Sequence, residues 1–92
     1  MRIEFDAGKD RQNKLKHGIS LSFAQHLDWG NGFCWPDARF PYTEFRMRGL
    51  VPGGEVIYFV AFVERSNGLR ILSLRKANRN EERIYARNSY HC

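Results

Sequence analysis

The chain has 92 residues, a length that fits one small domain and leaves no room for a linker and a second core. Fifteen Lys and Arg against ten Asp and Glu give a net charge of +5, which favours polyanions such as RNA, DNA or an acidic protein as partners. Hydrophobic residues make up 42% of the chain, enough for a folded core.

Several classes of protein are excluded by local sequence. Cys34 and Cys92 are too few for a disulfide framework, and neither has the spacing of a zinc site. The start "MRIEFDAGKD" carries charges where a signal peptide needs an apolar stretch, and the longest apolar run, 56–63, is too short to cross a bilayer. We therefore expect a cytoplasmic protein without membrane contact, metal or cofactor.

The first third of the chain is predicted to contain one strand and two helices. Residues 1–6 alternate apolar and charged positions, as a strand does, and Asp6 is placed to cap a helix. That helix should end at Gly18, because glycine readily takes the left-handed conformation that a helix end often needs. The Ser-x-x-Gln spacing at Ser22 predicts a capping box for a second helix, which should end near Gly30.

Strand patterns occupy the rest of the chain up to the last helix. Residues 32–41 contain two prolines, which predicts an edge strand or a strand followed by an irregular loop. From residue 44 the period is two, "VPGG" at 51–54 supplies a turn, and the apolar run 56–63 belongs in the middle of the sheet. Another turn at 66–68 leads into the strand "LRILSLRKA".

The last predicted element is a helix that begins at Asn78, whose side chain can cap it while Glu81 reaches back from three residues on. The order of elements indicates an α+β domain over residues 1–92. We expect an antiparallel sheet of about four to five strands, two N-terminal helices and a C-terminal helix.

Two arginines at strand ends are the main candidates for chemistry. Arg65 closes the central strand and Arg75 closes the next, and arginine suits phosphate because its planar guanidinium donates two parallel hydrogen bonds and stays charged. The alternative is that both arginines only pair with carboxylates on the solvent face, namely Glu44, Glu55 or Glu64.

The strand alternation places other residues beside these arginines. Phe59, Ala61 and Val63 should share a face with Arg65, and Ile71 and Ser73 should share one with Arg75. Sequence leaves open whether the two faces coincide. Because antiparallel pairing does not bring the arginines side by side, and Arg75 should lie opposite residues near Ile57, a flat groove is implied if both bind one ligand.

The segment "KLKHGIS" at 14–20 has a structural and a functional explanation. Lys16 and His17 fall in the last turn of the predicted helix, where cations complement the helix dipole by roughly 0.3 to 1 kcal/mol. A phosphate-handling site would also need such cations. No Gly-rich phosphate loop, Ser-His-Asp arrangement or metal-spaced cluster occurs in the chain.

Four aromatic residues bracket the irregular middle of the chain, where their faces could stack on unpaired bases. The alternative is a hydrophobic core under a loop, and we favour the core for both tryptophans. The four residues are Trp29, Trp35, Phe40 and Tyr42.

Taken together, the motifs resemble the BrnT family of type II toxins. "FDAGKDRQNKLKHGISLSFAQ" is similar to that family's Asp, Lys, Asn and Lys-His-Gly pattern, and "DARFPYTEFRMRGL" to its Asp-x-Arg, Tyr and Glu-x-Arg segment. The most specific part is "VERSNGLRILSLRKANRNEERIYAR", which resembles the family's Arg-Ile-x-Ser-x-Arg-x-Ala and Glu-Arg-x-x-Tyr order. Thr43, Asn78 and the doubled carboxylate at 81–82 depart from the family pattern.

The resemblance implies a RelE-like fold and an RNA endonuclease that halts translation. It also implies a BrnA-type antitoxin that neutralises the toxin, with DNA bound only through the antitoxin's part of the complex. Cleavage without metal would proceed by attack of a ribose 2′-hydroxyl on the adjacent phosphate. Fixed cations would then stabilise the charge that builds on the phosphoryl oxygens.

Residue roles follow as predictions. Arg65 and Arg75 are the catalytic candidates, together with Lys16 and His17, which would position the backbone or move a proton. Glu44 and Glu64 are possible bases. The residues predicted to bind RNA are Lys9, Lys14, Arg46, Arg70 and Lys76.

Two other functions compete with the ribonuclease. A binding module without catalysis would use the same basic surface to hold nucleic acid or an acidic protein. A DNA reader that represses an operon by itself is the weaker alternative, because we find no helix-turn-helix pattern.

Overall fold

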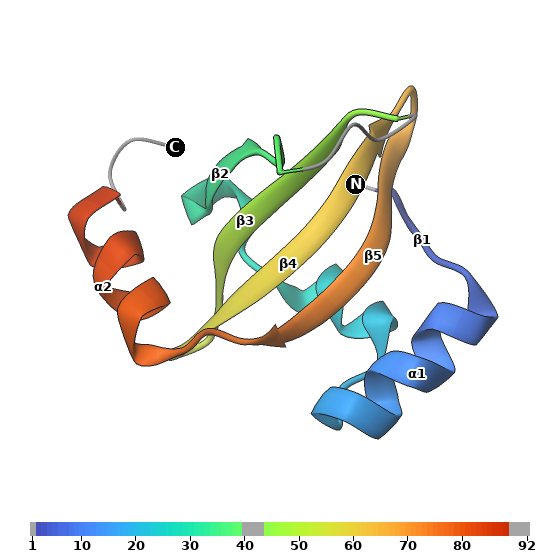
Figure 1. Cartoon of the computed structure of the whole chain (residues 1–92), viewed down its shortest axis with the longest axis horizontal. Coiled ribbons are helices and arrows are strands. Elements are labelled where there is room, and N and C mark those ends of the chain that lie inside the picture. Colours follow the sequence, from blue (N-terminus) through green and yellow to red (C-terminus); the bar gives the residue numbers. More distant parts are fainter. Residues whose placement is uncertain (1, 40–43, 89–92) are drawn as a thin grey trace.

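The computed structural model describes residues 2–39 and 44–88. In this part of the chain a five-stranded sheet has the order β1-β5-β4-β3-β2, and two α-helices, α1 and α2, lie well apart at its right and left in Figure 1. Two 3₁₀ segments, η1 and η2, connect α1 to β2. The bounds are β1 Arg2–Glu4, α1 Ala7–His17, η1 Leu21–His26, η2 Trp29–Asn31, β2 Phe33–Pro36, β3 Arg46–Gly53, β4 Val56–Arg65, β5 Gly68–Lys76 and α2 Arg79–Asn88.

The sheet is mixed, so the expectation of an antiparallel sheet is wrong at one edge. β2 to β5 pair antiparallel, whereas β1 pairs in parallel with β5, with Arg2 opposite Gly68. No hairpin joins β1 to β5, and hence no turn forces their directions to oppose. Gly68 lets the two strands approach closely, since a Cβ there would overlap the backbone of Arg2.

The first helix begins and ends as predicted. The Asp6 side chain accepts a hydrogen bond from the Lys9 amide, and Gly18 takes a left-handed φ of 71° after the last turn. Within the helix, Asn13 is buried and faces β5. Leu15, the one large apolar residue of this helix, is exposed, so the attachment of α1 to the sheet depends on Asn13 more than on an apolar stripe.

The second N-terminal helix is a 3₁₀ helix rather than an α-helix, and it starts earlier than predicted. Ser20, not Ser22, caps η1, with its hydroxyl accepting from the Ser22 amide. Leu21, Ala24 and Leu27 are all buried, and their spacing of three matches the three residues per turn of a 3₁₀ helix. Burial of this row therefore decides the geometry of the segment.

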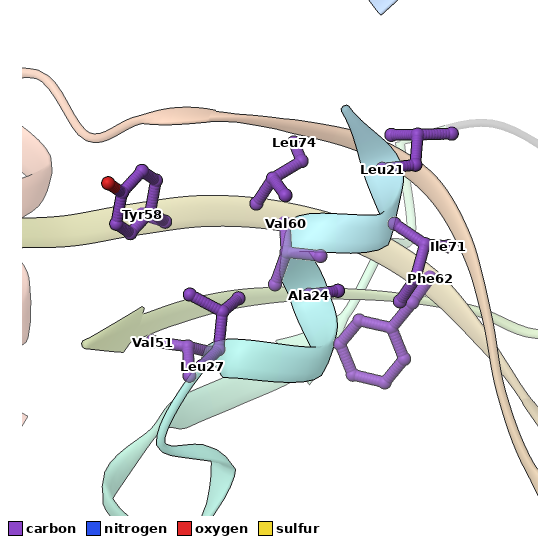
Figure 2. Close-up of a cluster of buried hydrophobic side chains, with 9 residues drawn as sticks. All are labelled: Leu21, Ala24, Leu27, Val51, Tyr58, Val60, Phe62, Ile71 and Leu74. Atoms are coloured by element: carbon purple, nitrogen blue, oxygen red, sulfur yellow. The ribbon is translucent and has the colours of Figure 1, made fainter. Parts of the chain in front are cut away.

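The core lies between η1 and the sheet, as Figure 2 shows. Fully buried aliphatic side chains from both layers meet there, and burial of each such side chain contributes about 1.5 to 3 kcal/mol. Phe62 and Tyr58 of β4 close the cluster at its two ends. Its members are Leu21, Ala24, Leu27, Val51, Tyr58, Val60, Phe62, Ile71 and Leu74.

Turns and caps around the sheet agree with the sequence in part. The β3–β4 turn is made by Gly54 and Glu55. The prediction of a turn over 51–54 is therefore wrong for Val51 to Gly53, which belong to β3. Asn78 and Glu81 form the predicted capping box at the start of α2: the Glu81 amide donates to Asn78 Oδ1 at 2.8 Å, and the Asn78 amide donates to Glu81 Oε1 at 2.9 Å.

A bulge in β5 sets which side chains reach the face of the sheet opposite η1. Ala61 pairs with Ser73 and Phe62 with Ile71, so Leu72 is an extra residue on β5. Ile71 therefore faces the core together with Leu74, and the prediction that it shares a face with Ser73 and Arg75 is wrong. Ser73 and Arg75 point to the opposite side.

Candidate functional site

The face of the sheet opposite η1, called here the arginine face, carries five arginines. Because Tyr58, Val60 and Phe62 point into the core, the alternate residues of β4 point away from it. Residues paired with these alternate positions share their face, and they include arginines from both neighbouring strands. The five are Arg46, Arg48, Arg65, Arg70 and Arg75.

Arg75 forms a bidentate ion pair with Glu81 at the start of α2. Its Nη1 and Nη2 donate to the two carboxylate oxygens of Glu81 at 2.8 and 2.9 Å, and its guanidinium carbon lies 4.3 Å from the Phe59 ring centroid. Burial opposes ionisation of Glu81, but hydrogen bonds from Arg75 and the Asn78 amide outweigh it and hold the pKa of this carboxyl below its usual value. Arg75 thus has a partner, although not one of the three carboxylates that sequence suggested.

Arg48 is the site residue that sequence reasoning missed. Its guanidinium carbon lies 5.1 Å from the Phe59 ring centroid and 5.7 Å from that of Trp35. The alternation of residues 44, 46 and 48 put Arg48 on the same face as Arg46, but the proximity to Phe59 depends on the strand register. Trp35, Arg48, Phe59 and Arg75 form a row of alternating aromatic rings and cations across four adjacent strands.

Arg65 lies at the other end of the arginine face. It pairs with Gly68 while Arg75 pairs with Phe59, so six residues of β4, or about 20 Å, separate the two positions. Its guanidinium is 3.9 Å from both Glu4 and Glu44. One phosphate group cannot contact both arginines, and the pairing of Arg65 with Glu44 is the solvent-face arrangement that sequence offered as the alternative.

Three of the predicted site residues of α1 come together at the free edge of β5. Lys9, Lys16 and His17 line a polar cavity of about 210 Å³ with Gln12, Asn13, Leu72 and Ser73. Ser73 is two residues from Arg75 on the same face, so the cavity opens beside the arginine face. The structure thus brings these three side chains to the same strand as Arg75.

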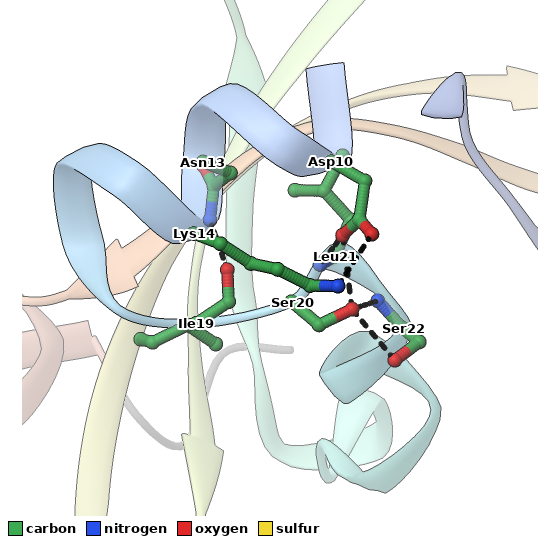
Figure 3. A network of polar contacts seen from close by, with 7 residues as sticks. All are labelled: Asp10, Asn13, Lys14, Ile19, Ser20, Leu21 and Ser22. Carbon is green, nitrogen blue, oxygen red and sulfur yellow. Dashed lines mark hydrogen bonds and ion pairs between the residues drawn. The ribbon is translucent and has the colours of Figure 1, made fainter. Parts of the chain in front are cut away.

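A separate network fixes the segment that follows α1 (Figure 3). Asp10 accepts hydrogen bonds from the Leu21 amide at 2.7 Å and from the Ser20 hydroxyl at 2.9 Å. Lys14 Nζ forms an ion pair with Asp10 Oδ2 at 3.3 Å. These contacts hold the pKa of Asp10 below its usual value; the Leu21 amide contributes most. Lys14 therefore takes part in a structural network between α1 and η1.

Two other predicted residues lie away from the arginine face. Lys76 pairs with Tyr58 and lines an open pocket with Phe23 and His26 on the η1 side. Glu64 pairs with Leu69 and also points to the η1 side, near the hairpin end. Arg70 is on the arginine face, in a cavity that Glu4 also lines.

The aromatic residues divide between core and site. Trp29 packs edge-on against Phe62, with its indole nitrogen donating to the Ala24 carbonyl at 2.9 Å, as the core interpretation predicts. Trp35 is half-buried on the arginine face instead. The candidates for base stacking at positions 40 and 42 lie outside the described residues.

Among the described residues, no three His, Cys, Asp or Glu side chains are placed to share a metal ion. Within the same ranges, no helix has the length and apolar character needed to span a membrane.

A comparison with models of known protein families matches most of the chain. The family model for the ribonuclease toxin BrnT, of the type II toxin–antitoxin system, matches residues 5–81. This range begins one residue after β1 and ends at Glu81, so it includes α1, the five arginines of the arginine face and the partner of Arg75. No curated protein matches the chain. The chain belongs to the BrnT family of ribonuclease toxins.

Proposed function

We propose that this protein cleaves RNA without a metal ion and that the arginine face binds the RNA. The observation that carries the proposal is the gathering of five arginines on one sheet face, two of them against the same phenylalanine ring. Family membership supports ribonuclease activity in general. A fixed row of guanidinium groups supplies both attraction for a polyanion and bidentate hydrogen bonds for phosphate.

The reaction is attack of a ribose 2′-oxygen on the adjacent phosphorus. The bond from phosphorus to the 5′-oxygen of the next nucleotide breaks, which leaves a 2′,3′-cyclic phosphate and a free 5′-hydroxyl. The 2′-hydroxyl loses a proton to a base, and the leaving oxygen gains one from an acid. Negative charge grows on the phosphoryl oxygens, so fixed cations lower the barrier more than they strengthen binding.

The geometry supports different roles for the two catalytic arginines. Arg75, which a carboxylate and an aromatic ring hold in place, contacts the reacting phosphate. Arg65 holds the RNA backbone farther along the face, about 20 Å away by strand spacing. Lys16 and His17 are the candidates for proton transfer, because their cavity reaches Ser73 on the same strand as Arg75. Glu44 remains a possible base, whereas Glu64 points to the other face.

A type II toxin family implies an antitoxin partner. We propose that this partner is BrnA-type, that it blocks the toxin by direct binding, and that DNA is bound only by the antitoxin's part of the complex. The toxin then inhibits translation in the cytoplasm, where its RNA substrate is found.

The test is RNA cleavage by the purified chain in excess EDTA, with end-group analysis of the products. Arg65→Ala and Arg75→Ala are compared with wild type, and Arg11→Ala, which removes an exposed arginine of α1, serves as the control. Cyclic phosphate ends that the control produces and that decrease in the two variants would support the proposal.

Two results would contradict it. Intact RNA with a folded wild-type protein, with and without ribosomes, would favour a binding module that does not cleave. Cleavage that EDTA abolishes and Mg²⁺ restores would replace the metal-free reaction with a metal-dependent one.

A further inference from the structure

Arg75 keeps a complete pair of hydrogen-bond donors free. A guanidinium has five N–H donors. Nη1 donates to Glu81 at 2.8 Å and to the Lys76 carbonyl at 3.3 Å, and Nη2 donates once to Glu81 at 2.9 Å. The Nε hydrogen and the second Nη2 hydrogen, which lie side by side, have no acceptor among the described residues. This edge has the parallel geometry that phosphate oxygens accept.

Arg48 reaches the Phe59 ring from β3, whereas Arg75 reaches it from β5, and Arg48 makes no hydrogen bond in the described part of the chain. Its Nε is buried there without a partner, so the nitrogens of this half-buried side chain that a ligand can reach are the two terminal ones. The flanking rings of Trp35 and Phe59 restrict the side chain without using any of its donors.

Glu81 fixes the orientation of Arg75. The capping box ties its carboxylate to the Asn78 amide at 2.9 Å, so the side chain has little freedom. The Glu81 carboxylate accepts hydrogen bonds from Nη1 and Nη2 of Arg75, and the guanidinium carbon of Arg75 lies 4.3 Å from the centroid of the Phe59 ring. The carboxylate supplies one negative charge near two guanidinium groups, which leaves the cluster positive.

We propose that Arg48 and Arg75 bind one phosphate group of the RNA backbone beside Phe59, and that Glu81 is a positioning residue that aims the free edge of Arg75 at it. The inference rests on the proposed ribonuclease function for the identity of the polyanion, but it concerns binding, which can be measured without cleavage. It adds Arg48 and Glu81 to the site.

The first experiment measures binding of a short fluorescein-labelled 2′-O-methyl oligoribonucleotide, which lacks the attacking hydroxyl, by fluorescence anisotropy at several salt concentrations. Arg48→Gln should weaken binding about fivefold to tenfold and reduce the slope of log affinity against log salt by about 0.7, the value for one lost phosphate contact on a single strand. Arg79→Gln, which removes an exposed arginine of α2, is the matched control and should change affinity less than twofold. Equal affinity of Arg48→Gln and wild type would overturn the site.

The second experiment tests the positioning role with Glu81→Gln. Glutamine also suits the third position of a capping box, so the helix start is kept while the charge and one acceptor for Arg75 are lost. The expected result is a kcat reduced at least tenfold with an unchanged circular dichroism spectrum. If the ion pair only stabilised the fold, Tm would fall with kcat unchanged. If Glu81 competed with phosphate, the oligonucleotide would bind more tightly. Either result contradicts the proposal.

The two proposals fail in different ways. If wild type cuts no RNA but binds the oligonucleotide in an Arg48-dependent manner, the ribonuclease function fails and the phosphate site stands. If Arg48→Gln binds and cuts RNA as wild type does, the ribonuclease function stands and the phosphate site fails.

Discussion

The side chain of Asn13 completes the edge of β5 at Leu74. Its Nδ2 donates to the Leu74 carbonyl at 2.7 Å, and its Oδ1 accepts from the Leu74 amide at 3.1 Å, so one side chain takes the place of a neighbouring strand beyond β1. The same Nδ2 also donates to the Ile19 carbonyl at 2.9 Å. Lys9 and His17, four residues before and after Asn13, lie on the same side of α1, and this contact therefore fixes their position against β5.

Asn13→Ala should destabilise the protein by about 2 to 4 kcal/mol, because it leaves several backbone groups without partners at about 1 to 3 kcal/mol for each buried one. Urea denaturation followed by circular dichroism measures the change. Gln12→Ala, which removes the exposed neighbour, should stay within about 0.5 kcal/mol of wild type. If Asn13→Ala lowered the free energy of unfolding by less than about 0.5 kcal/mol, water would be replacing these contacts and α1 would be attached in another way.

Gly68→Ala should cost more stability than Gly54→Ala. Gly54 has a φ of 67° in the β3–β4 turn with open space around it, so an added methyl group meets only backbone strain of about 1 to 2 kcal/mol. At Gly68 the methyl group would collide with the backbone of Arg2. Relief of this collision requires β1 to move away from β5. Urea denaturation gives both losses, and amide hydrogen exchange should accelerate in β1 only for Gly68→Ala. Equal losses and unchanged exchange would show that β1 contributes little.

Much of the fold could be predicted from local chemistry. Asp6, Gly18 and the Asn78–Glu81 capping box act within one helical turn, so the residues that decide each helix end are adjacent in sequence. The parallel pairing of β1 and the bulge at Leu72 could not be predicted in this way. They depend on contacts between segments far apart in the chain, which periodicity does not encode.

The same limit applies to the candidate site. The sequence placed Arg65 and Arg75 on neighbouring strands, but the side on which Arg75 lies depends on the bulge. Arg48 was visible in the alternation after residue 44, and only the register of β3 with β4 brings it to Phe59. The partner of Arg75 is Glu81, which the sequence identified only as part of a helix cap. Its carboxylate accepts hydrogen bonds both from Arg75 and from the Asn78 amide.

Asp37→Asn should remove stability at neutral pH and lose this effect in acid. The hydrogen bonds from the Arg39 side chain, at 2.9 Å to each carboxylate oxygen, lower the pKa of Asp37 to about 2 from 3.8. A carboxyl whose pKa is lower in the folded state stabilises the fold above its unfolded pKa, and this contribution disappears as pH falls through the folded pKa. The difference in unfolding free energy between wild type and variant should thus shrink between pH 3.8 and about 2.

Arg39→Gln is the matched variant for this effect. Because the Arg39 side chain is the largest cause of the shift, the variant should flatten the same part of the pH profile, and the double variant should add nothing further. Parallel curves for wild type and Asp37→Asn from neutral pH to pH 2 would contradict the interpretation.

Arg75→Ala and Arg65→Ala should affect different kinetic constants. Arg75 contacts the charge that develops in the transition state, so its loss should lower kcat about 10²- to 10³-fold, as loss of one such donor does in other enzymes. Arg65 lies about 20 Å away along β4 and should mainly raise KM, up to about tenfold. Steady-state cleavage of a labelled RNA measures both, with Arg75→Lys as a variant that keeps the charge and loses the planar fork. A fall in kcat that is as large for Arg65→Ala would require RNA bound in a different register.

Arg70→Gln and Lys76→Gln should separate the two faces of the sheet. Arg70 lies on the arginine face, whereas Lys76 lies beside Phe23 and Tyr58 on the η1 side. RNA on the arginine face would contact Arg70 and miss Lys76. Arg70→Gln should therefore reduce the salt slope of oligonucleotide binding by about 0.7, and Lys76→Gln should leave both slope and affinity within twofold of wild type. A reduced slope for Lys76→Gln alone would place the RNA on the η1 side and move the binding surface to the pocket between Phe23 and His26.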